Sequence, residues 1–113
     1  MAVDLFAGVA VTDLARARSW YERLLGSAPA FFPNATEAVW QIGEHQYLYI
    51  EELPERAGHA MNTLFVDDLD ARVRAIADRR IEPAQMETYD NGVRKVVFRD
   101  PDGNETGFGG APA

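Results

Sequence analysis

The sequence of 113 residues contains no cysteine, only two histidines and a single lysine. The absence of cysteine excludes disulfides, thiolate zinc sites and cysteine nucleophiles. No apolar run approaches the length of about 20 residues that a membrane-spanning helix needs. The first residues, Met1–Val11, also lack a basic segment and a signal-peptide cleavage site. The sequence therefore predicts a cytoplasmic protein with no membrane partner.

Basic residues are few and scattered, so nucleic acid is not an expected partner. The chain has 11 basic and 18 acidic residues and a net charge of -7 at pH 7. A nucleic-acid-binding protein usually gathers positive charge on one surface to neutralise phosphates. Lysine accounts for one of the 11 basic residues and arginine for the others, a usage that favours a bacterial origin.

The length fits one domain over residues 1–113, and its first half has a clear order of elements. Residues 5–11 are predicted to form a buried strand, and Thr12-Asp13 is predicted to cap a helix with an apolar stripe that includes Tyr21 and Leu24. Gly26 ends this helix. Three strands follow at 30–32, 38–42 and 47–50, so the predicted order is βαβββ.

The second half repeats this order. A strand at 63–66 precedes a cap at Asp67-Asp68 and a helix, and strands follow at 83–88, 93–98 and 106–108. The segment "VTDLARAR" at Val11 parallels "VDDLDARV" at Val66, an offset of 66 − 11 = 55 residues. An internal repeat is predicted, with module 1 at about 1–55 and module 2 at about 56–113. The alternative is two unrelated strand-helix units. The Asn91-Gly92 pair predicts a type I′ hairpin.

Three segments, "VTDLARARSWYERLLG", "FVDDLDARVRAI" and "FRDPDGNETGF", resemble motifs of the vicinal oxygen chelate superfamily. This superfamily includes glyoxalase I, bleomycin-resistance proteins and extradiol dioxygenases. The resemblance covers essentially the whole chain. It implies an α+β fold in which two βαβββ modules form a curled mixed β-sheet cup with the helices on the outside. One fold hosts many reactions, so the resemblance does not fix the activity.

Strand alternation predicts which side chains face the cup. Tyr47, Tyr49 and Glu51 face the cavity, because the intervening residues Leu48 and Ile50 pack beneath the helix.

Lys95 faces the cavity by the same alternation, since Val96 and Phe98 pack inward. Two interpretations of this lysine stay open. It binds an anionic group of a ligand, or it reaches solvent along its own aliphatic stem.

The resemblance also implies four metal-ligand positions, two in each module, which fall on Phe6, Tyr49, Met61 and Gly107. None of these is a usual ligand, because a divalent cation needs nitrogen or oxygen donors in a fixed cage. We therefore expect neither a metal nor another cofactor, and we interpret Gly107 as a position without a side chain that leaves space for a ligand.

A displaced metal site is the alternative. Asp4, Glu51, His59 and Glu105 each lie two residues from one of these positions and share its strand face. Charged residues near strand ends, such as Asp4 and Glu105, are usually solvated. His59 falls in the predicted linker between the modules.

The favoured function is metal-independent binding of a small, partly apolar organic molecule. The predicted pocket consists of Phe6, Tyr47, Tyr49, Met61, Phe65, Lys95 and Gly107. No catalytic residue is identified, and Ser19 has no histidine partner at a recognisable spacing. One alternative is a metal-dependent or acid-base lyase, isomerase or dioxygenase of the same superfamily. Another is a structural or regulatory module whose cup is closed by its own side chains.

A homodimer is expected, because each module exposes a strand edge and half of a cup. Short two-module relatives are usually homodimers. Two-fold symmetry would give two equivalent pockets.

Overall fold

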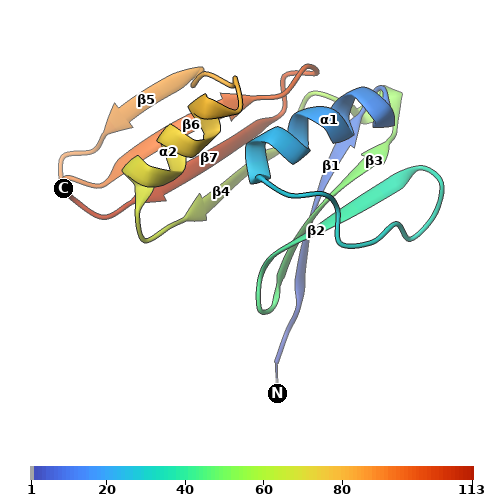
Figure 1. The fold of residues 1–113 in the computed structure, drawn as a ribbon, viewed down its shortest axis with the longest axis horizontal. Coiled ribbons are helices and arrows are strands. Elements are labelled where there is room, and N and C mark those ends of the chain that lie inside the picture. Colours follow the sequence, from blue (N-terminus) through green and yellow to red (C-terminus); the bar gives the residue numbers. More distant parts are fainter. Residues whose placement is uncertain (1) are drawn as a thin grey trace.

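The computed structural model describes residues 2–113, and Met1, the first residue of the predicted domain, lies outside the described residues. Two sheets lie side by side, each with a helix on one face (Figure 1). The first module consists of β1 (Leu5–Val11), α1 (Leu14–Leu25), β2 (Glu37–Gly43) and β3 (Gln46–Glu52). A short 3₁₀ helix, η1 (Pro54–Arg56), leads to the second module. This module consists of β4 (Met61–Phe65), α2 (Leu69–Asp78), β5 (Gln85–Thr88), β6 (Arg94–Arg99) and β7 (Glu105–Gly110).

The two modules share one topology. The first sheet has the order β1-β3-β2 and the second β4-β7-β6-β5. In each module the first strand pairs in parallel with the last, and the neighbouring pairs are antiparallel. β1 ends at Val11 and β4 at Phe65, while α1 begins at Leu14 and α2 at Leu69. The predicted α+β fold of repeated modules is confirmed, with two sheets that remain unclosed.

One predicted strand of the first module is reduced to a single bridge. Phe31 pairs with Val39 as an isolated bridge, and no strand covers residues 30–32. Pro29 and Pro33 flank this segment. Proline lacks the N–H that a sheet ladder requires, so the chain touches β2 at one residue and does not run along it.

The turn between β5 and β6 differs from the prediction. A type I′ hairpin needs a positive φ at both central residues. Only Gly92 of the Asn91-Gly92 pair has one, at 88°. The Gly92 N–H donates to the Tyr89 carbonyl at 2.9 Å, and the Asn91 side chain accepts a hydrogen bond from the Val93 N–H at 3.0 Å. Asn91 therefore stabilises the turn through its side chain, without the left-handed backbone that was predicted.

Both helices begin at the predicted caps, and α1 ends at the predicted glycine. Asp13 accepts a hydrogen bond from the Arg16 N–H at 3.1 Å, and Asp68 accepts one from the Ala71 N–H at 3.0 Å. Gly26 ends α1 with a φ of 80°. The apolar stripes of both helices contribute to one continuous core between the helices and the sheets. Its largest fully buried side chains include Tyr21, Trp40, Ile76, Phe98 and Phe108.

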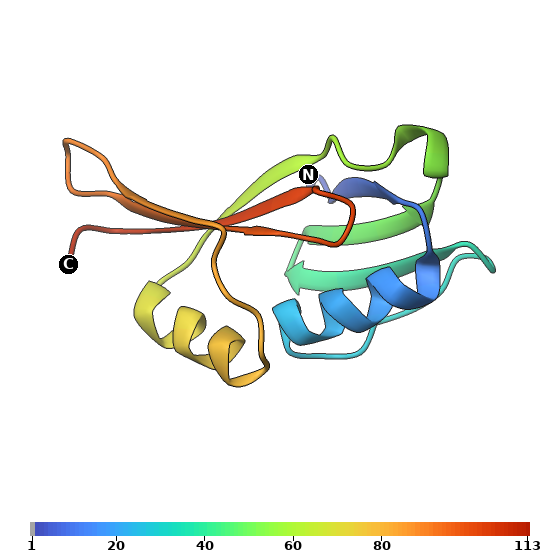
Figure 2. The ribbon, with the colours of Figure 1, turned by 90° about the horizontal axis from the view of Figure 1, so that it is seen from above.

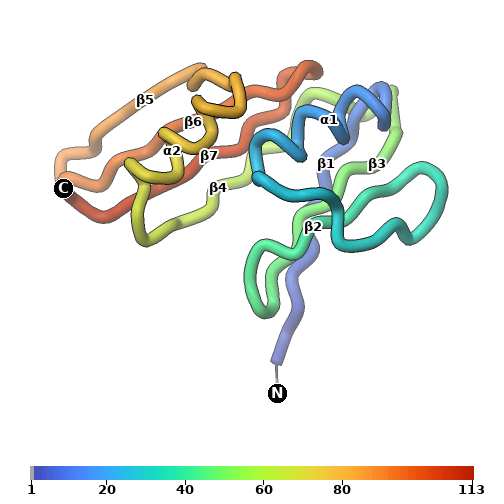
Figure 3. The backbone as a smooth tube through the Cα atoms, in the orientation of Figure 1, coloured from blue at the N-terminus to red at the C-terminus, as the bar shows by residue number. Residues whose placement is uncertain are grey.

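Both helices lie on the same side of the two sheets, so the opposite faces stay open (Figure 2). Those opposite faces are called the open faces below. The chain passes between the modules once, through the segment 53–60 that joins β3 to β4 (Figure 3). Within residues 2–113, no helix is long and apolar enough to cross a membrane.

Candidate functional site

Aromatic side chains cover the open face of the first sheet. Phe6 lies opposite Tyr47 on the neighbouring strand. Their rings stack with centroids 4.4 Å apart and an interplanar angle of 7°. Tyr49 lies opposite Gly8, and a Cβ added to Gly8 would come within 2.6 Å of the Tyr49 ring. The hydroxyl end of the tyrosine ring therefore lies over Gly8 of β1, in space that any larger residue at Gly8 would fill.

A glycine has the same role on the open face of the second sheet. A Cβ added to Gly107 would lie 2.8 Å from Lys95 Cε and 3.2 Å from the Thr63 hydroxyl oxygen. The Lys95 side chain thus occupies the space above Gly107. Phe65 lies over Gly109 in the same manner, 3.2 Å from the position of a Cβ.

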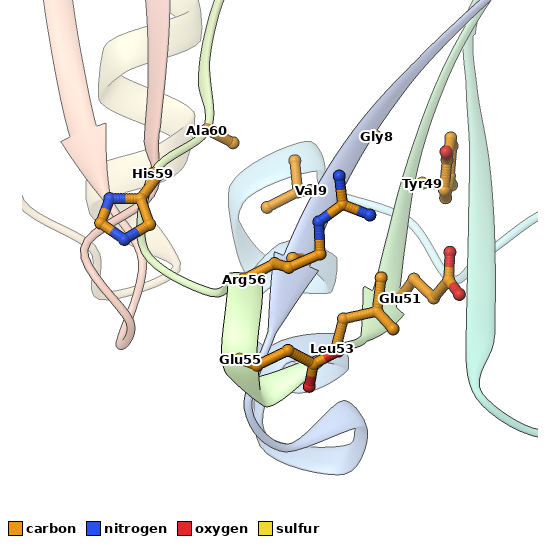
Figure 4. A pocket seen from close by; sticks show the side chains of 10 residues that line it. Gly8, Val9, Tyr49, Glu51, Leu53, Glu55, Arg56, His59 and Ala60 are labelled. Carbon is orange, nitrogen blue, oxygen red and sulfur yellow. The ribbon is translucent and has the colours of Figure 1, made fainter.

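A pocket of about 570 Å³ opens where this aromatic face meets the linker between the modules (Figure 4). β1 and β3 form its floor, and η1 and the linker form its opposite wall. The pocket is lined by Gly8, Val9, Ala10, Tyr49, Glu51, Leu53, Glu55, Arg56, His59 and Ala60.

η1 brings Arg56 to this pocket. The helix is attached to the end of β1, because the Leu53 N–H donates to the Val11 carbonyl at 2.9 Å. The Arg56 N–H then donates to the Leu53 carbonyl at 3.0 Å. Figure 4 shows the Arg56 side chain reaching over β1, with Tyr49 and Glu51 on the far side of the pocket. The residue pattern around Arg56 does not indicate this position, because η1 has no hydrophobic period that would place the side chain on a particular face.

The Asn104 side chain lies outside the pocket and hydrogen-bonds to both its floor and its linker wall. Its Oδ1 accepts hydrogen bonds from the Gly58 N–H at 3.1 Å and the Ala60 N–H at 2.9 Å. Its Nδ2 donates to the Ala10 carbonyl at 2.9 Å. Ala10 belongs to the floor and Ala60 to the linker wall, so this one amide sets their separation.

A buried carboxylate holds Asn104 in turn. Asp100 is 5% exposed. Its Oδ1 accepts from the Asp102 and Asn104 N–H groups, each at 2.9 Å. Its Oδ2 accepts from the Tyr21 hydroxyl and from Asn104 Nδ2, each at 2.8 Å. Burial raises the pKa of Tyr21 far above its usual range, and the neighbouring Asp100 carboxylate raises it further. The network links α1 to the β6–β7 turn.

The arrangement of repeated strand-helix modules and the motifs in them correspond to a known family. The model of the Glyoxalase/Bleomycin resistance protein/Dioxygenase superfamily matches residues 3–108. The chain belongs to this superfamily.

Solved structures agree with this assignment. The crystal structure of a glyoxalase/bleomycin resistance protein from Catenulispora acidiphila DSM 44928 is 56% identical, with a TM-score of 0.95 and coverage of 98% of this chain and 100% of that one. A bleomycin-binding protein complexed with bleomycin is 20% identical, with a TM-score of 0.78 and coverage of 97% and 99%.

A lactoylglutathione lyase from Agrobacterium tumefaciens is 18% identical, with a TM-score of 0.75 and coverage of 98% and 95%. At such low identities the last two structures show the fold alone. No curated protein matches the sequence.

The seven side-chain positions predicted for ligand binding share the open faces but not one cavity. Tyr49 lines the pocket. Phe6 and Tyr47 lie further along the same strands, two register positions before Gly8 and Tyr49. The other four lie on the second sheet: Met61 and Phe65 on β4, Lys95 on β6 and Gly107 on β7.

The four alternative metal donors do not come together. Asp4 Oδ1 lies 2.8 Å from His45 Nδ1, and Glu105 forms an ion pair of 3.0 Å with Arg99. Only Glu51 and His59 line the pocket. Within the described part of the chain, no three His, Asp or Glu side chains are placed to hold a cation. The donors of this single chain therefore do not fit the divalent cation of metal-dependent superfamily members.

Proposed function

We propose that the protein binds a small, partly apolar organic molecule without a metal ion, in the pocket between β1, β3 and η1. The observation that carries this proposal is the pocket itself. Its volume of about 570 Å³ lies in the range of small-molecule sites, about 300–1,000 Å³. The Tyr49 ring offers a flat apolar surface, and a few polar groups at the pocket edge would orient a ligand.

The fold of a bleomycin-binding protein supports this proposal, because the same arrangement of modules holds an organic ligand in that structure. The donor set supports metal independence, since no position of the family's metal cage carries a usual ligand.

A second candidate is acid-base catalysis by a lyase or isomerase of the superfamily. It is favoured by one observation, that Glu51 and His59 line the same pocket and are the types of side chain that transfer protons.

We also propose that the protein works as a homodimer in the bacterial cytoplasm. β1 and β4 are edge strands that are each paired on one side only, with β3 and with β7, among the described residues. Exposed apolar side chains accompany both edges, and Met61 and Phe65 are 76% and 67% exposed. A second copy would cover these side chains and complete each cup, as isologous symmetry allows. The similarity to a Catenulispora acidiphila protein supports the bacterial origin.

A thermal-shift screen of planar and amphipathic compounds in the presence of a chelator tests the binding proposal. A ligand at 100 times its Kd is expected to add about 2.7 kcal/mol of stability. The metal content of protein purified without chelator is the second measurement. Stoichiometric nickel, zinc, iron or manganese at the pocket, together with ligand binding that requires it, would overturn metal independence. A lack of response from every chemical class would instead favour a closed structural module.

A further inference from the structure

Two side chains of opposite charge lie in the pocket without an ionic partner. Glu51 extends from β3 and Arg56 from η1, and both line the cavity. They form no ion pair with each other, and neither makes a side-chain hydrogen bond or ion pair elsewhere in residues 2–113. Figure 4 shows the guanidinium group and the carboxylate on opposite sides of the same space.

The two charged side chains extend from backbone segments that are each held in place. Glu51 is in the central strand of its sheet, paired with Ala10 on one side and Glu37 on the other. η1 is fixed to β1 by the hydrogen bond from Leu53 to Val11. The backbones of β3 and η1 are therefore positioned independently of each other, and the two side chains form no ion pair across the space between them. A ligand in this space would have a charged group of each sign within the pocket lining.

A second carboxylate lies beside Glu51, outside the lining of the pocket. Glu37 lies directly opposite Glu51 on β2, so that two carboxylates share one row of the open face. Like charges at directly opposed positions destabilise a sheet. A cationic group placed beside Glu51 would relieve this repulsion. The remaining ionisable side chains at the pocket, apart from that of Tyr49, belong to Glu55 and His59, which project at its rim and away from the space between Arg56 and Glu51 (Figure 4).

We propose that the ligand is a small amphoteric molecule with an acidic group and a protonated amine on one apolar body. Its carboxylate, or a comparable planar anion, pairs with the Arg56 guanidinium, whose parallel N–H groups match two oxygens. Its amine binds Glu51, and its apolar part lies on the Tyr49 ring. This inference rests on the proposed function, because it names the class of molecule that the same pocket takes.

Calorimetric titration with matched probes tests this charge pairing. The zwitterions are 4-(aminomethyl)benzoate and 3-(aminomethyl)benzoate, which differ in the separation of their charges. The singly charged controls are 4-methylbenzoate and 4-methylbenzylamine. We expect at least one zwitterion to bind tenfold or more tightly than either control, a difference of about 1.4 kcal/mol.

Two variants assign each charge. Arg56→Gln is expected to remove the advantage of the zwitterion over 4-methylbenzylamine, and Glu51→Gln its advantage over 4-methylbenzoate. Arg74→Gln, on α2 and outside the pocket, is the matched control and is expected to leave every affinity unchanged. Unfolding curves establish that each variant folds.

Several results would overturn the inference. Zwitterions that bind no more tightly than the singly charged probes, or that do not bind at all, contradict it. A uniform loss of affinity for all probes in both variants also contradicts it. If singly charged or neutral compounds bind the pocket equally well, the proposed binding function stands and only the ligand class is wrong. If no compound of any class binds, both proposals fail.

Discussion

At the scale of single residues, glycines determine how the open faces are covered. Tyr49 lies over Gly8, and Lys95 lies over Gly107, each in the space that a Cβ would need. In both contacts the absence of a Cβ lets the neighbouring side chain lie against the backbone of the sheet. The open faces are therefore lined by flat rings and an aliphatic stem, a surface that suits a planar ligand more than a deep cavity would.

Substitution of Gly107 by alanine is predicted to cost little stability. The new Cβ would meet Lys95 Cε, which is near the end of a flexible side chain and can move away. The lower entropy of the unfolded alanine chain offsets part of this strain, by about 0.4–1 kcal/mol. We expect a loss below about 1 kcal/mol in denaturant unfolding.

Gly110→Ala is the matched control for that substitution. There the new Cβ would lie 2.7 Å from Leu69 Cβ, an atom at the fixed base of a buried side chain. Overpacking of this kind costs about 1–3 kcal/mol. Equal losses in the two variants would contradict the assignment of Lys95 to the space above Gly107.

Tyr21 is predicted to limit stability at alkaline pH. Burial, and then the Asp100 carboxylate, raise its pKa in the folded protein above the ordinary value of 10.0. The folded state therefore keeps a proton that the unfolded state loses above about pH 10. The contribution of Tyr21 to the free energy of unfolding is therefore at its full value below pH 10. Above pH 10 the free energy of unfolding decreases, with a slope that approaches about 1.4 kcal/mol per pH unit.

Tyr21→Phe tests this linkage through unfolding free energies between pH 8 and 11. The variant is expected to lose about 1–2 kcal/mol at neutral pH, because Asp100 loses a hydrogen-bond donor. It should also lose the alkaline slope that Tyr21 contributes. Tyr89→Phe, at a partly exposed position, serves as the control. An unchanged slope in Tyr21→Phe would exclude Tyr21 as its source.

The sequence predicted some of the site residues and missed others for a physical reason. Alternation placed Tyr49 and Glu51 on the open face because strand geometry fixes the direction of successive side chains. Arg56 and the amide of Asn104 follow no period. Arg56 reaches the pocket through η1, and Asn104 reaches its partners at Ala10 and Ala60 through the tertiary arrangement of two modules.

At the scale of elements, the β6–β7 turn attaches the second module to the first. The turn residue Asn104 binds the backbone of β1 and of the linker, and the Asp102 carboxylate accepts a hydrogen bond from the Thr12 hydroxyl at 2.7 Å. The turn that closes one hairpin therefore also fixes the angle between the sheets. The pocket lies at this junction, so its shape depends on the same contacts.

Asn104→Ala is predicted to lower stability by about 2–4 kcal/mol. It removes an amide that is 1% exposed and leaves the Ala10 carbonyl and the Gly58 and Ala60 N–H groups without their partner. Hydrogen exchange at the Gly58 and Ala60 amides should also become faster. Asn34→Ala is the control, since the hydrogen bonds of Asn34, with Thr36 and with Glu37 at the start of β2, are local and exposed, and the substitution should cost about 1 kcal/mol or less. A comparable loss in the two variants would disprove the role of Asn104.

Most elements were predictable because each combines an apolar period with a cap or a turn. The two departures have local causes. Pro29 and Pro33 prevent a ladder around Phe31. Asn91 adopts no positive φ because its side chain already stabilises the turn. The bridge at Phe31 and the turn at Asn91 both depend on particular hydrogen bonds, which a pattern of residue types does not specify.

At the scale of the whole molecule, the repeat was visible in the sequence as an offset of 55 residues, but the relative placement of the modules was not. It depends on contacts between distant positions, such as the hydrogen bond between Tyr21 and Asp100. The resulting arrangement leaves both open faces and the edges β1 and β4 uncovered.

The homodimer is predicted to depend on the exposed apolar side chains of β4. Light scattering at micromolar concentration should give about twice the monomer mass of 12.6 kDa. Phe65→Glu should shift the mass toward the monomer, because an interface that desolvates Phe65 would bury an unpaired charge. Met86→Glu, at an equally exposed position on β5, should remain dimeric. A wild-type mass near 12.6 kDa would contradict the proposal.

The central claim is that an organic ligand binds without metal in the pocket between β1, β3 and η1. The most direct test is amide chemical-shift mapping by NMR, with chelator present, for the compound that stabilises the protein most in the thermal-shift screen. We expect the largest shifts at Gly8, Ala10, Tyr49 and Ala60, with saturation at a single Kd. Shifts confined to residues away from this pocket, or shifts that appear only after a divalent cation is added, would contradict it.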